Sequence, residues 1–165
     1  MKVRDVMVRD VVAIDPSASL AEAAQLMQEA NIGILPVVEE GQVCGVITDR
    51  DLVVRAIAVG ADLTSTPVGE CATGDPVVAH PDWSLDRAME AMARAQIGRL
   101  PVIDDDNALT GIVTLGSLAL RAKKDKQTLA AAKEVSRRSV KAMASRRAPS
   151  TPSKHGAART RKRAS

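Results

Sequence analysis

Aromatic side chains are nearly absent from this chain of 165 residues, which contains Trp83 but no tyrosine or phenylalanine. Hydrophobic residues still make up an ordinary 45% of it, so a core must be built from Val, Ile, Leu, Ala and Met. Cysteine is also scarce, and Cys44 and Cys71 lack the spacing of a metal site or a disulfide framework. Both are expected to be reduced, structural residues, because a free cysteine behaves as a small apolar side chain.

Motifs that would indicate catalysis or a bound metal are missing as well. No Ser/His/Asp or Cys/His arrangement stands out, and no GxxxxGK(S/T) phosphate loop is present. His80 and His155 have no metal-ligand partners at a useful spacing, and the acidic run 104–107 lacks the pattern of an EF-hand. The chain is therefore expected not to be an enzyme and to require no metal or cofactor.

Long apolar runs are missing too. None approaches the ~20 residues that span a bilayer, and the N-terminal residues lack the apolar segment of a signal peptide. The sequence therefore predicts no transmembrane segment and a cytoplasmic location.

The net charge of +3 hides an uneven distribution along the chain. Residues 121–165 contain 15 Lys/Arg and 2 Asp/Glu, whereas residues 1–120 contain 8 and 18. This pattern predicts an acidic globular part followed by a basic tail over residues 122–165, partly helical and then disordered. The basic clusters within 137–163 could bind nucleic acid without sequence specificity, or the tail could fold back on the acidic part.

The chain contains an internal repeat. Residues 20–52 read LAEAAQLMQEANIGILPVVEEGQVCGVITDRDL, and residues 85–118 read LDRAMEAMARAQIGRLPVIDDDNALTGIVTLGSL. Matching residues are 65 positions apart up to the Leu-Pro-Val run and 66 apart after it, because the second copy has one extra turn residue. A unit of ~60 residues buries too little surface to be stable alone, so the copies should pack face to face and leave clefts for small ligands.

Each copy shows the same order of elements, β-α-β-β-α. A short apolar strand, over 11–14 or 77–79, precedes an amphipathic helix, and Ser19 with Glu22 forms a capping box at the first helix start. Two apolar runs around a polar turn then predict a hairpin. A second helix follows, over 49–59 in the first copy.

The predicted fold class is α/β (α+β), with two such repeats packed around a pseudo-twofold axis. The first repeat would span residues 1–62 and the second residues 63–121, each with a three-stranded sheet and both helices on one face. Asn31, Gly33 and Gly98 are expected to end helices, the glycines through a positive φ.

The G-h-h-P-V-h hairpin of each copy and the V-I-T-x-x-D-L ending of the first resemble the cystathionine-beta-synthase (CBS) domain family. Two copies in tandem resemble a CBS pair, also called a Bateman module. The resemblance covers roughly residues 1–121. It implies a sensor of an adenosine-containing ligand, namely AMP, ADP, ATP or S-adenosylmethionine, bound in the clefts between the repeats. It also implies a disc-like homodimer and a protein partner to be regulated.

Thr48 and Asp51 lie where the last strand of the first copy meets its second helix. A helix start offers unpaired N–H groups to a phosphate, and a carboxylate can accept bonds from the hydroxyls of a ribose. The resemblance assigns Thr48 and Asp51 such contacts. The same Thr-x-x-Asp pattern is also a capping box, and the two roles can coexist.

The second copy has Thr114 and Ser117 at these positions, so its cleft lacks the carboxylate. A hydrogen bond to a charged group contributes about 1.5–3 kcal/mol, so unequal sites are expected, with one strong nucleotide site per chain. The resemblance implies that Arg99, whose counterpart is Ile34, reaches the phosphates held in the Asp51 cleft. Arg50 is expected to point to the poorer cleft or to be a solvated surface residue.

Because aromatics are lacking, the adenine pocket is expected to be aliphatic. By the family pattern it would be formed by Met7, Val12, Ile32 and Gly33, although each of these residues could be plain core instead. The leading hypothesis is a non-catalytic regulatory module that senses an adenosine-containing ligand and signals through a conformational or dimer change. The alternative is a nucleic-acid-associated protein in which the CBS pair is a dimerisation scaffold and the basic tail binds the polyanion.

Overall fold

A computed structural model of the chain describes residues 1–121 and 129–137. The elements of the first half are, in chain order, η1 (Val3–Asp5), α1 (Leu20–Ala30), β1 (Ile34–Glu39), β2 (Gln42–Thr48), α2 (Asp49–Asp51), η2 (Leu52–Ala56) and η3 (Ile57–Val59). Those of the second half are α3 (Val68–Cys71), β3 (Thr73–Gly74), α4 (Leu85–Ala95), β4 (Arg99–Ile103), β5 (Leu109–Thr114) and α5 (Leu115–Arg121).

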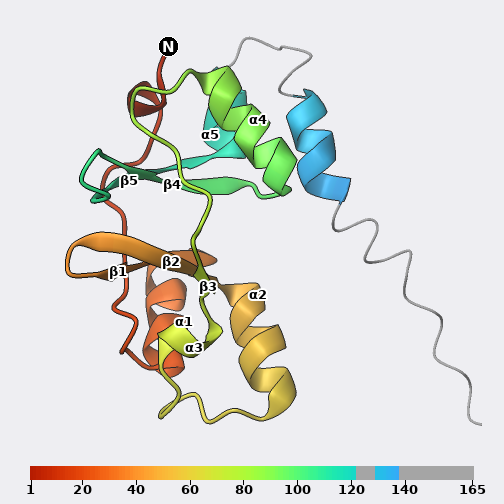
Figure 1. Cartoon of the computed structure of the whole chain (residues 1–165). Helices are drawn as coiled ribbons and strands as arrows, with labels where there is room; N and C mark the ends of the chain where they lie inside the picture. Colours follow the sequence, from red (N-terminus) through yellow and green to blue (C-terminus); the bar gives the residue numbers. More distant parts are fainter. Residues whose placement is uncertain (122–128, 138–165) are drawn as a thin grey trace, which may run out of the picture.

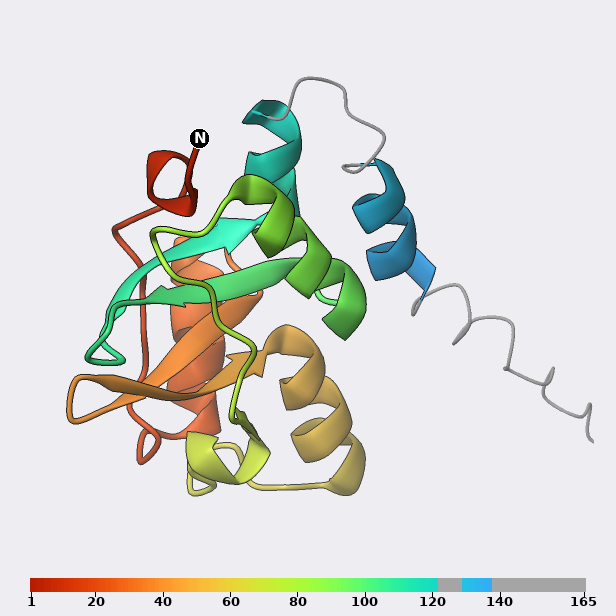
Figure 2. The same cartoon turned by 45° about the horizontal axis from the view of Figure 1, so that its top comes forward.

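The two β-hairpins lie next to each other in the middle of the molecule, with the helices on the outside (Figures 1 and 2). Helices α1 and α2 cover the hairpin β1–β2, and α4 and α5 cover the hairpin β4–β5. The hairpins are joined directly, since the backbone N–H of Val43 donates to Asn107 O at 3.1 Å and Asn107 Nδ2 donates back to Val43 O at 3.2 Å. The predicted mixed fold of two similar halves is confirmed.

The ends of the two long helices, α1 and α4, are determined by local sequence features. Ser19 and Glu22 form the expected capping box at α1, and the backbone N–H and hydroxyl of Ser19 lower the pKa of the Glu22 carboxyl. Left-handed residues end the two long helices, Asn31 with φ 52° and Gln96 with φ 55°. The prediction that Gly33 and Gly98 supply the positive φ is wrong, because neither glycine has one.

Gly33 is needed for space instead. A Cβ at this position would lie 2.7 Å from Asp49 Oδ2, so any larger residue would require the Asp49 side chain to move.

The first predicted strand of each repeat, over 11–14 and 77–79, is reduced to a single parallel bridge. Ile14 N donates to Pro36 O at 3.0 Å and Ile14 O accepts from Val38 N at 2.9 Å. The next bond in one direction would need the missing N–H of Pro36, and in the other that of Pro16. Ala79 makes the equivalent two bonds with the second hairpin.

Prolines also bound this second bridge. Pro101 and Pro81 stand where Pro36 and Pro16 stand in the first repeat, so neither apolar run can extend its ladder. The expectation of a three-stranded sheet within each repeat is therefore wrong, and the physical reason is the placement of these four prolines.

The segments that begin the repeats are exchanged between the two halves. Val3 of η1 is fully buried in the core of the second half, beside Ala79 and Leu100. Its counterpart Val68 is fully buried in the core of the first half, beside Leu20. The backbone follows the same exchange, since β3 pairs with β2 and residue Val8 pairs with Ile112.

Two surface ion pairs join the N-terminal segment to the second half. Lys2 Nζ lies 2.6 Å and Arg4 Nη2 lies 2.8 Å from Asp82 Oδ1. The hydrogen bond from Lys2 and then the charge of Arg4 lower the pKa of Asp82. The predicted sequence boundary at residue 62 thus does not coincide with the division into cores, because each core contains a few residues from the other repeat.

The predicted helix over 49–59 forms, but not as a uniform α-helix. Its middle part, η2, is π-helical, with the N–H of Ile57 donating to Leu52 O. A π-helical turn inserts an extra residue into the helix, and such turns occur frequently at functional sites. It follows directly on the Thr48–Asp51 segment.

The predicted tail is only partly described. Residues 129–137 form a helix beside the second half, where Ala131 is buried in the core and Val135 packs against it. The basic clusters from 138 onward, predicted to contact a polyanion, lie outside the described residues. Within the described part of the chain, every helix is too short or too polar to cross a membrane.

The exchange predicts that Val3 contributes to stability although it is nearly at the chain end. Val3→Ala should lower the free energy of unfolding by about 2 kcal/mol, since two buried methyl groups are lost. Val68→Ala should have a similar effect, and both are measured by chemical denaturation. Met1→Ala is the control, because Met1 is 70% exposed. Equal stability of Val3→Ala and the control would contradict the exchange.

Candidate ligand-binding cleft

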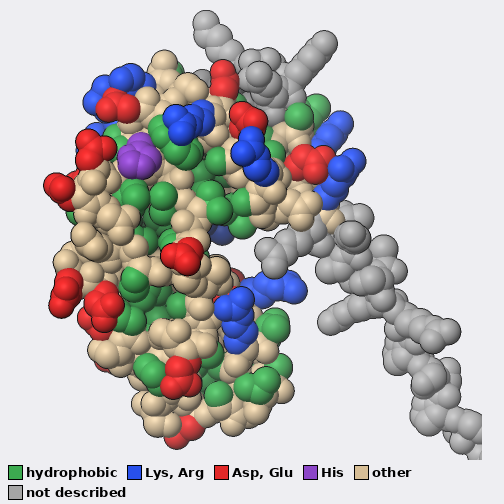
Figure 3. All heavy atoms as spheres, in the orientation of Figure 1, with side chains coloured by type: hydrophobic (Ala, Val, Ile, Leu, Met, Phe, Trp, Pro, Cys, Tyr) green, Lys and Arg blue, Asp and Glu red, His purple; other side chains and the backbone are tan. Residues whose placement is uncertain are grey.

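A cleft of about 600 Å³ opens between the two halves. Its volume is within the range of ordinary small-molecule sites. Figure 3 shows the hollow between the halves, with Lys and Arg side chains at its edge. The first half lines it with Ile34, Val46, Thr48, Arg50, Asp51, Val54 and Arg55. The second half lines it with Thr73, Asp75, Pro76, Val77, Ala95, Ile97, Gly98, Arg99 and Pro101.

Three of the residues predicted to bind a nucleotide are brought together here: Thr48, Asp51 and Arg99. Thr48 and Asp51 come from the junction of β2 and α2, and Arg99 begins β4 in the other half. These segments are far apart in sequence, so only the packing of the two halves places them in one cleft. Their proposed role in nucleotide binding remains a prediction.

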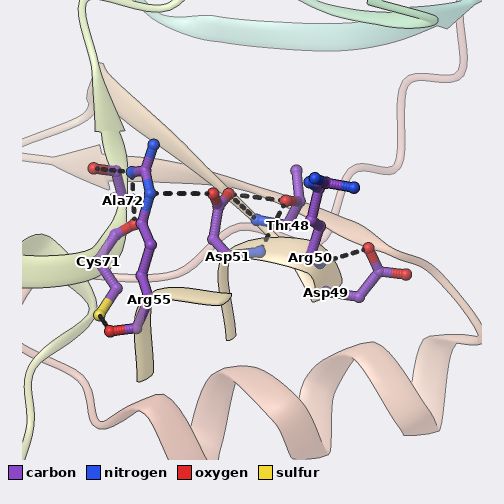
Figure 4. Close-up of polar contacts among 7 residues, drawn as sticks. All are labelled: Thr48, Asp49, Arg50, Asp51, Arg55, Cys71 and Ala72. Atoms are coloured by element: carbon purple, nitrogen blue, oxygen red, sulfur yellow. Dashed lines mark hydrogen bonds and ion pairs between the residues drawn. The ribbon is translucent and has the colours of Figure 1, made fainter. Parts of the chain in front are cut away.

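Asp51 and Thr48 cap the helix start (Figure 4). Asp51 Oδ2 accepts from Thr48 N at 2.9 Å and from Thr48 Oγ1 at 2.7 Å, while Asp51 N donates to Thr48 Oγ1 at 3.2 Å. The capping-box interpretation is therefore confirmed. The same carboxylate also lines the cleft, so capping does not remove it from reach of a ligand.

The other oxygen of Asp51 faces Arg55. Arg55 Nε lies 3.4 Å from Asp51 Oδ1, and Arg55 Nη1 donates to Cys71 O at 3.0 Å and to Ala72 O at 3.4 Å. Figure 4 shows Arg55 between Asp51 and the chain at Cys71 and Ala72. One guanidinium thus links the capped helix start to the segment that leads into the second half.

Sequence reasoning missed Arg55 and Asp75. A signal for Arg55 was present, because residues four apart on a helix are neighbours, and Arg55 follows Asp51 by four. Asp75 carried no such signal. It reaches the cleft because β3 pairs with β2 of the other half, in a backbone conformation with φ 46°.

Arg50 was expected to point to the poorer cleft or to be a solvated surface residue. It is exposed, as the second alternative states, and it also lines the same cleft as Thr48 and Asp51. Its backbone N–H donates to Asp49 Oδ1 at 2.7 Å, which fixes the first turn of α2.

The four residues predicted to surround the adenine are not brought to this cleft. Met7, Val12, Ile32 and Gly33 are absent from its lining, whereas the second-repeat counterparts of Val12, Ile32 and Gly33 are present. These counterparts are Val77, Ile97 and Gly98. The physical reason is the face-to-face packing, which places one repeat's aliphatic residues against the other repeat's Thr-x-x-Asp segment.

Met7 and Ile32 pack instead against the two cores, Met7 beside the position of Gly111, where an added Cβ would lie 2.9 Å from the Met7 sulfur. Val12 is partly exposed.

In the second repeat, the start of α5 is capped in the same way, but by the hydroxyl of Ser117 in place of a carboxylate. Ser117 Oγ accepts from Thr114 N at 3.1 Å, and Ser117 N donates to Thr114 Oγ1 at 3.0 Å. Serine therefore keeps the helix start without offering a negative charge. Among the described residues, no cluster of His, Cys, Asp and Glu has the arrangement of a metal site.

A family model described as "CBS domain" matches residues 3–57 and 68–123, which together are more than half of the chain. This chain belongs to the CBS domain family. The CBS domain-containing protein YhcV of Bacillus subtilis (strain 168) is 44% identical over 118 residues, 72% of this chain and 83% of that protein.

Solved CBS structures show the same fold. CBSX2 in complex with AMP matches with a TM-score of 0.65 and 28% identity, over 73% of this chain and 95% of that chain. The CBS domain pair of protein MJ0100, in complex with 5′-methylthioadenosine and S-adenosyl-L-methionine, also has a TM-score of 0.65, with 29% identity over 73% of this chain and 94% of that chain. Both of these CBS structures thus contain adenosine-containing ligands.

The two CBS repeats predict how Asp51 can be replaced without loss of the fold. Asp51→Ala should lower the free energy of unfolding by about 1 kcal/mol, because the bond to Thr48 N is lost. Asp51→Ser should lose less, because serine makes that bond at position 117. Denaturation curves measure both. Glu22→Ala is the matched control, since it removes the equivalent cap from α1 outside the cleft. Equal losses for Ala and Ser at position 51 would contradict this account.

Proposed function

We propose that this CBS pair is a non-catalytic regulatory module that binds an adenosine-containing ligand in the cleft between its repeats. The observation that supports it is the meeting of Thr48, Asp51 and Arg99, from two different repeats, in one cleft of about 600 Å³. The ligands in the structures of CBSX2 and MJ0100 support the class of ligand.

Each side chain has a role that its chemistry allows. Asp51 Oδ1, whose only described partner is the long contact to Arg55, accepts bonds from the ribose hydroxyls. Thr48 and the start of α2 face the sugar-phosphate part, and Arg99 approaches it from the second repeat. Val77 and Ile97 supply aliphatic surface for the adenine in place of the missing aromatics.

Signalling follows from the position of the ligand between two bodies. A ligand that contacts both repeats binds best to one arrangement of them and shifts the population toward it. Arg55 can transmit this shift, because it joins Asp51 to Cys71 and Ala72 at the entry to the second repeat. The readout is a protein partner or a homodimer. The half-exposed Val53, Val54 and Ile57 on the helix 49–59 offer apolar surface for the second copy.

Removing the carboxylate tests the proposal. Asp51→Ser should weaken binding of the best adenosine ligand ten- to hundredfold, since a hydrogen bond to a charged group contributes about 1.5–3 kcal/mol. Calorimetric titration of the full chain with AMP, ADP, ATP and S-adenosylmethionine measures this. Glu22→Ala, which loses a cap but no cleft residue, should bind as the unmutated chain does. No binding by the unmutated chain at millimolar ligand would reject the proposed function.

The cleft that the sequence predicts beside Thr114 and Ser117 provides a reciprocal test. Ser117→Asp places a carboxylate beside Thr114 and should raise the stoichiometry from one bound ligand per chain toward two, with the new site gaining roughly tenfold or more in affinity. Ser117→Asn is the matched control without charge. Unchanged stoichiometry in a folded Ser117→Asp chain would show that the missing acid is not what distinguishes the two clefts.

A further inference from the structure

The helix over residues 129–137 follows the second repeat and packs against it, beside α4 (Figures 1 and 2). Ala131 is 4% exposed and belongs to the core of the second half, and Val135 packs against that core. The two residues are four positions apart, so they share one face of the helix. Leu129 and Ala130 are exposed. The helix is therefore attached to the second half by one narrow apolar face.

The surface on which this helix docks includes residues that line the cleft. A Cβ at Gly98 would lie 3.7 Å from Val135 Cγ1, so Val135 lies close to the backbone of Gly98. Ile97 packs against the same core as Val135. Both Ile97 and Gly98 line the cleft, whereas none of its described lining residues belongs to the helix. The helix thus reaches the cleft indirectly, through the segment 97–98.

The second repeat differs from the first at this surface. Beside Gly33, the space is taken by the side chain of Asp49, whose Oδ2 is 2.7 Å from the position of a Cβ. The counterpart of Asp49 is Leu115, which packs against the core of the second half together with Val135. Leu115 also lies next to Gly98, because its backbone N–H donates to Gly98 O at 2.8 Å. Leucine in place of an acid therefore gives the helix an apolar surface to dock on.

The docking of the helix is weak enough to be reversible. Nine residues form too short a helix to be stable alone in water, because isolated helices need about 12–15 residues. The helix therefore depends on its docked face, which buries only the small side chains of Ala131 and Val135. Their burial gains little beyond the conformational entropy that the helix loses on ordering. Docked and released states are thus close in free energy, and one further contact can change their ratio.

We propose that the helix 129–137 is a latch whose docking and the occupancy of the cleft stabilise each other. The docked helix restricts Gly98, which as a glycine has more backbone freedom than other residues. A ligand that contacts Ile97 and Gly98 restricts the same segment from the cleft. Whichever event comes first removes conformational entropy that the second would otherwise have to remove, so the two are positively coupled.

The inference rests on the proposed function, because it requires that an adenosine ligand binds in the cleft. It goes further in naming the element that responds to the ligand. That element directly precedes the most basic part of the chain, since residues 138–165 contain nine Lys/Arg and no Asp/Glu. Docking fixes the point from which this basic segment starts, and release frees it. Occupancy of the cleft would thereby control how far the basic segment can reach.

Hydrogen exchange of the full chain, measured by mass spectrometry with and without saturating ligand, tests the response of the latch. The ligand is whichever of AMP, ADP, ATP and S-adenosylmethionine binds most tightly in the calorimetric titration. We expect exchange in residues 129–137 to slow about fivefold when it is bound, at the low end of usual coupling between sites. Helix α1 is the internal control, because none of its residues lines the cleft, and its exchange should not change.

A variant that releases the latch tests the reverse direction. Ala131→Glu places a charge at a buried position, so residues 129–137 should exchange fast with or without ligand. Coupling between two sites is reciprocal, so this variant should also bind the ligand about fivefold more weakly. Ala130→Glu is the matched control, with the same substitution at the neighbouring exposed position, and should bind as the unmutated chain does. Val135→Ala should weaken binding by a smaller factor, and it replaces Ala131→Glu if denaturation shows that variant to be unfolded.

Two results would overturn the inference and leave the proposed function standing. One is a bound ligand with unchanged exchange in residues 129–137. The other is equal affinity of Ala131→Glu and Ala130→Glu for the ligand. Absence of binding by all four ligands would instead reject the proposed function, and the latch with it.

Discussion

The exchange of segments between the two repeats is the constraint on which the rest of the structure depends. Val3 completes the core of the second half and Val68 completes that of the first, both fully buried. If the halves moved apart, each core would lose one buried valine to water, which lowers the stability of both. The cleft between the halves is therefore held by the same contacts that hold the fold.

Under the proposed function, Asp51 would serve both stability and ligand binding. One oxygen holds the helix start through Thr48, and the other faces Arg55 and the cleft. A ligand that bonds to the second oxygen need not break the cap, but it competes with a guanidinium that also holds Cys71 and Ala72. Under the proposed function, this competition would link ligand binding to the connection between the repeats, which a regulatory module requires. The hydroxyl of Ser117 performs only the structural half of this role.

Much of the architecture could be read from local patterns. The repeat, the hairpins and the capping boxes depend on residues close together in sequence, and these expectations were met. The sequence also contains the reason why residues 11–14 form only one bridge and not a strand. Pro16 and Pro36 lack the two N–H groups that a longer hydrogen-bond ladder would need. The close approach of Gly33 to the Asp49 side chain could not be read in this way, because the two residues meet at the open end of the hairpin β1–β2.

The cleft was predictable only in part. Thr48 and Asp51 were placed there from their spacing together with the family resemblance, and Arg99 from the resemblance, and all three line the cleft. The aliphatic residues were assigned to the wrong repeat for this cleft, because an internal repeat in the sequence does not show which copy packs against which.

The sequence by itself determined the repeat, its elements and the unequal charge of the two Thr-x-x-Asp and Thr-x-x-Ser turns. These features follow from the periodicity of apolar side chains, from helix-capping residues and from turn residues, all of which are close together in sequence. The tertiary structure alone decided that β3 joins the opposite sheet and that Val77 and Ile97 line the same cleft as Asp51. The physical reason is that the apolar segments around Val3 and Val68 are buried in the core of the opposite repeat.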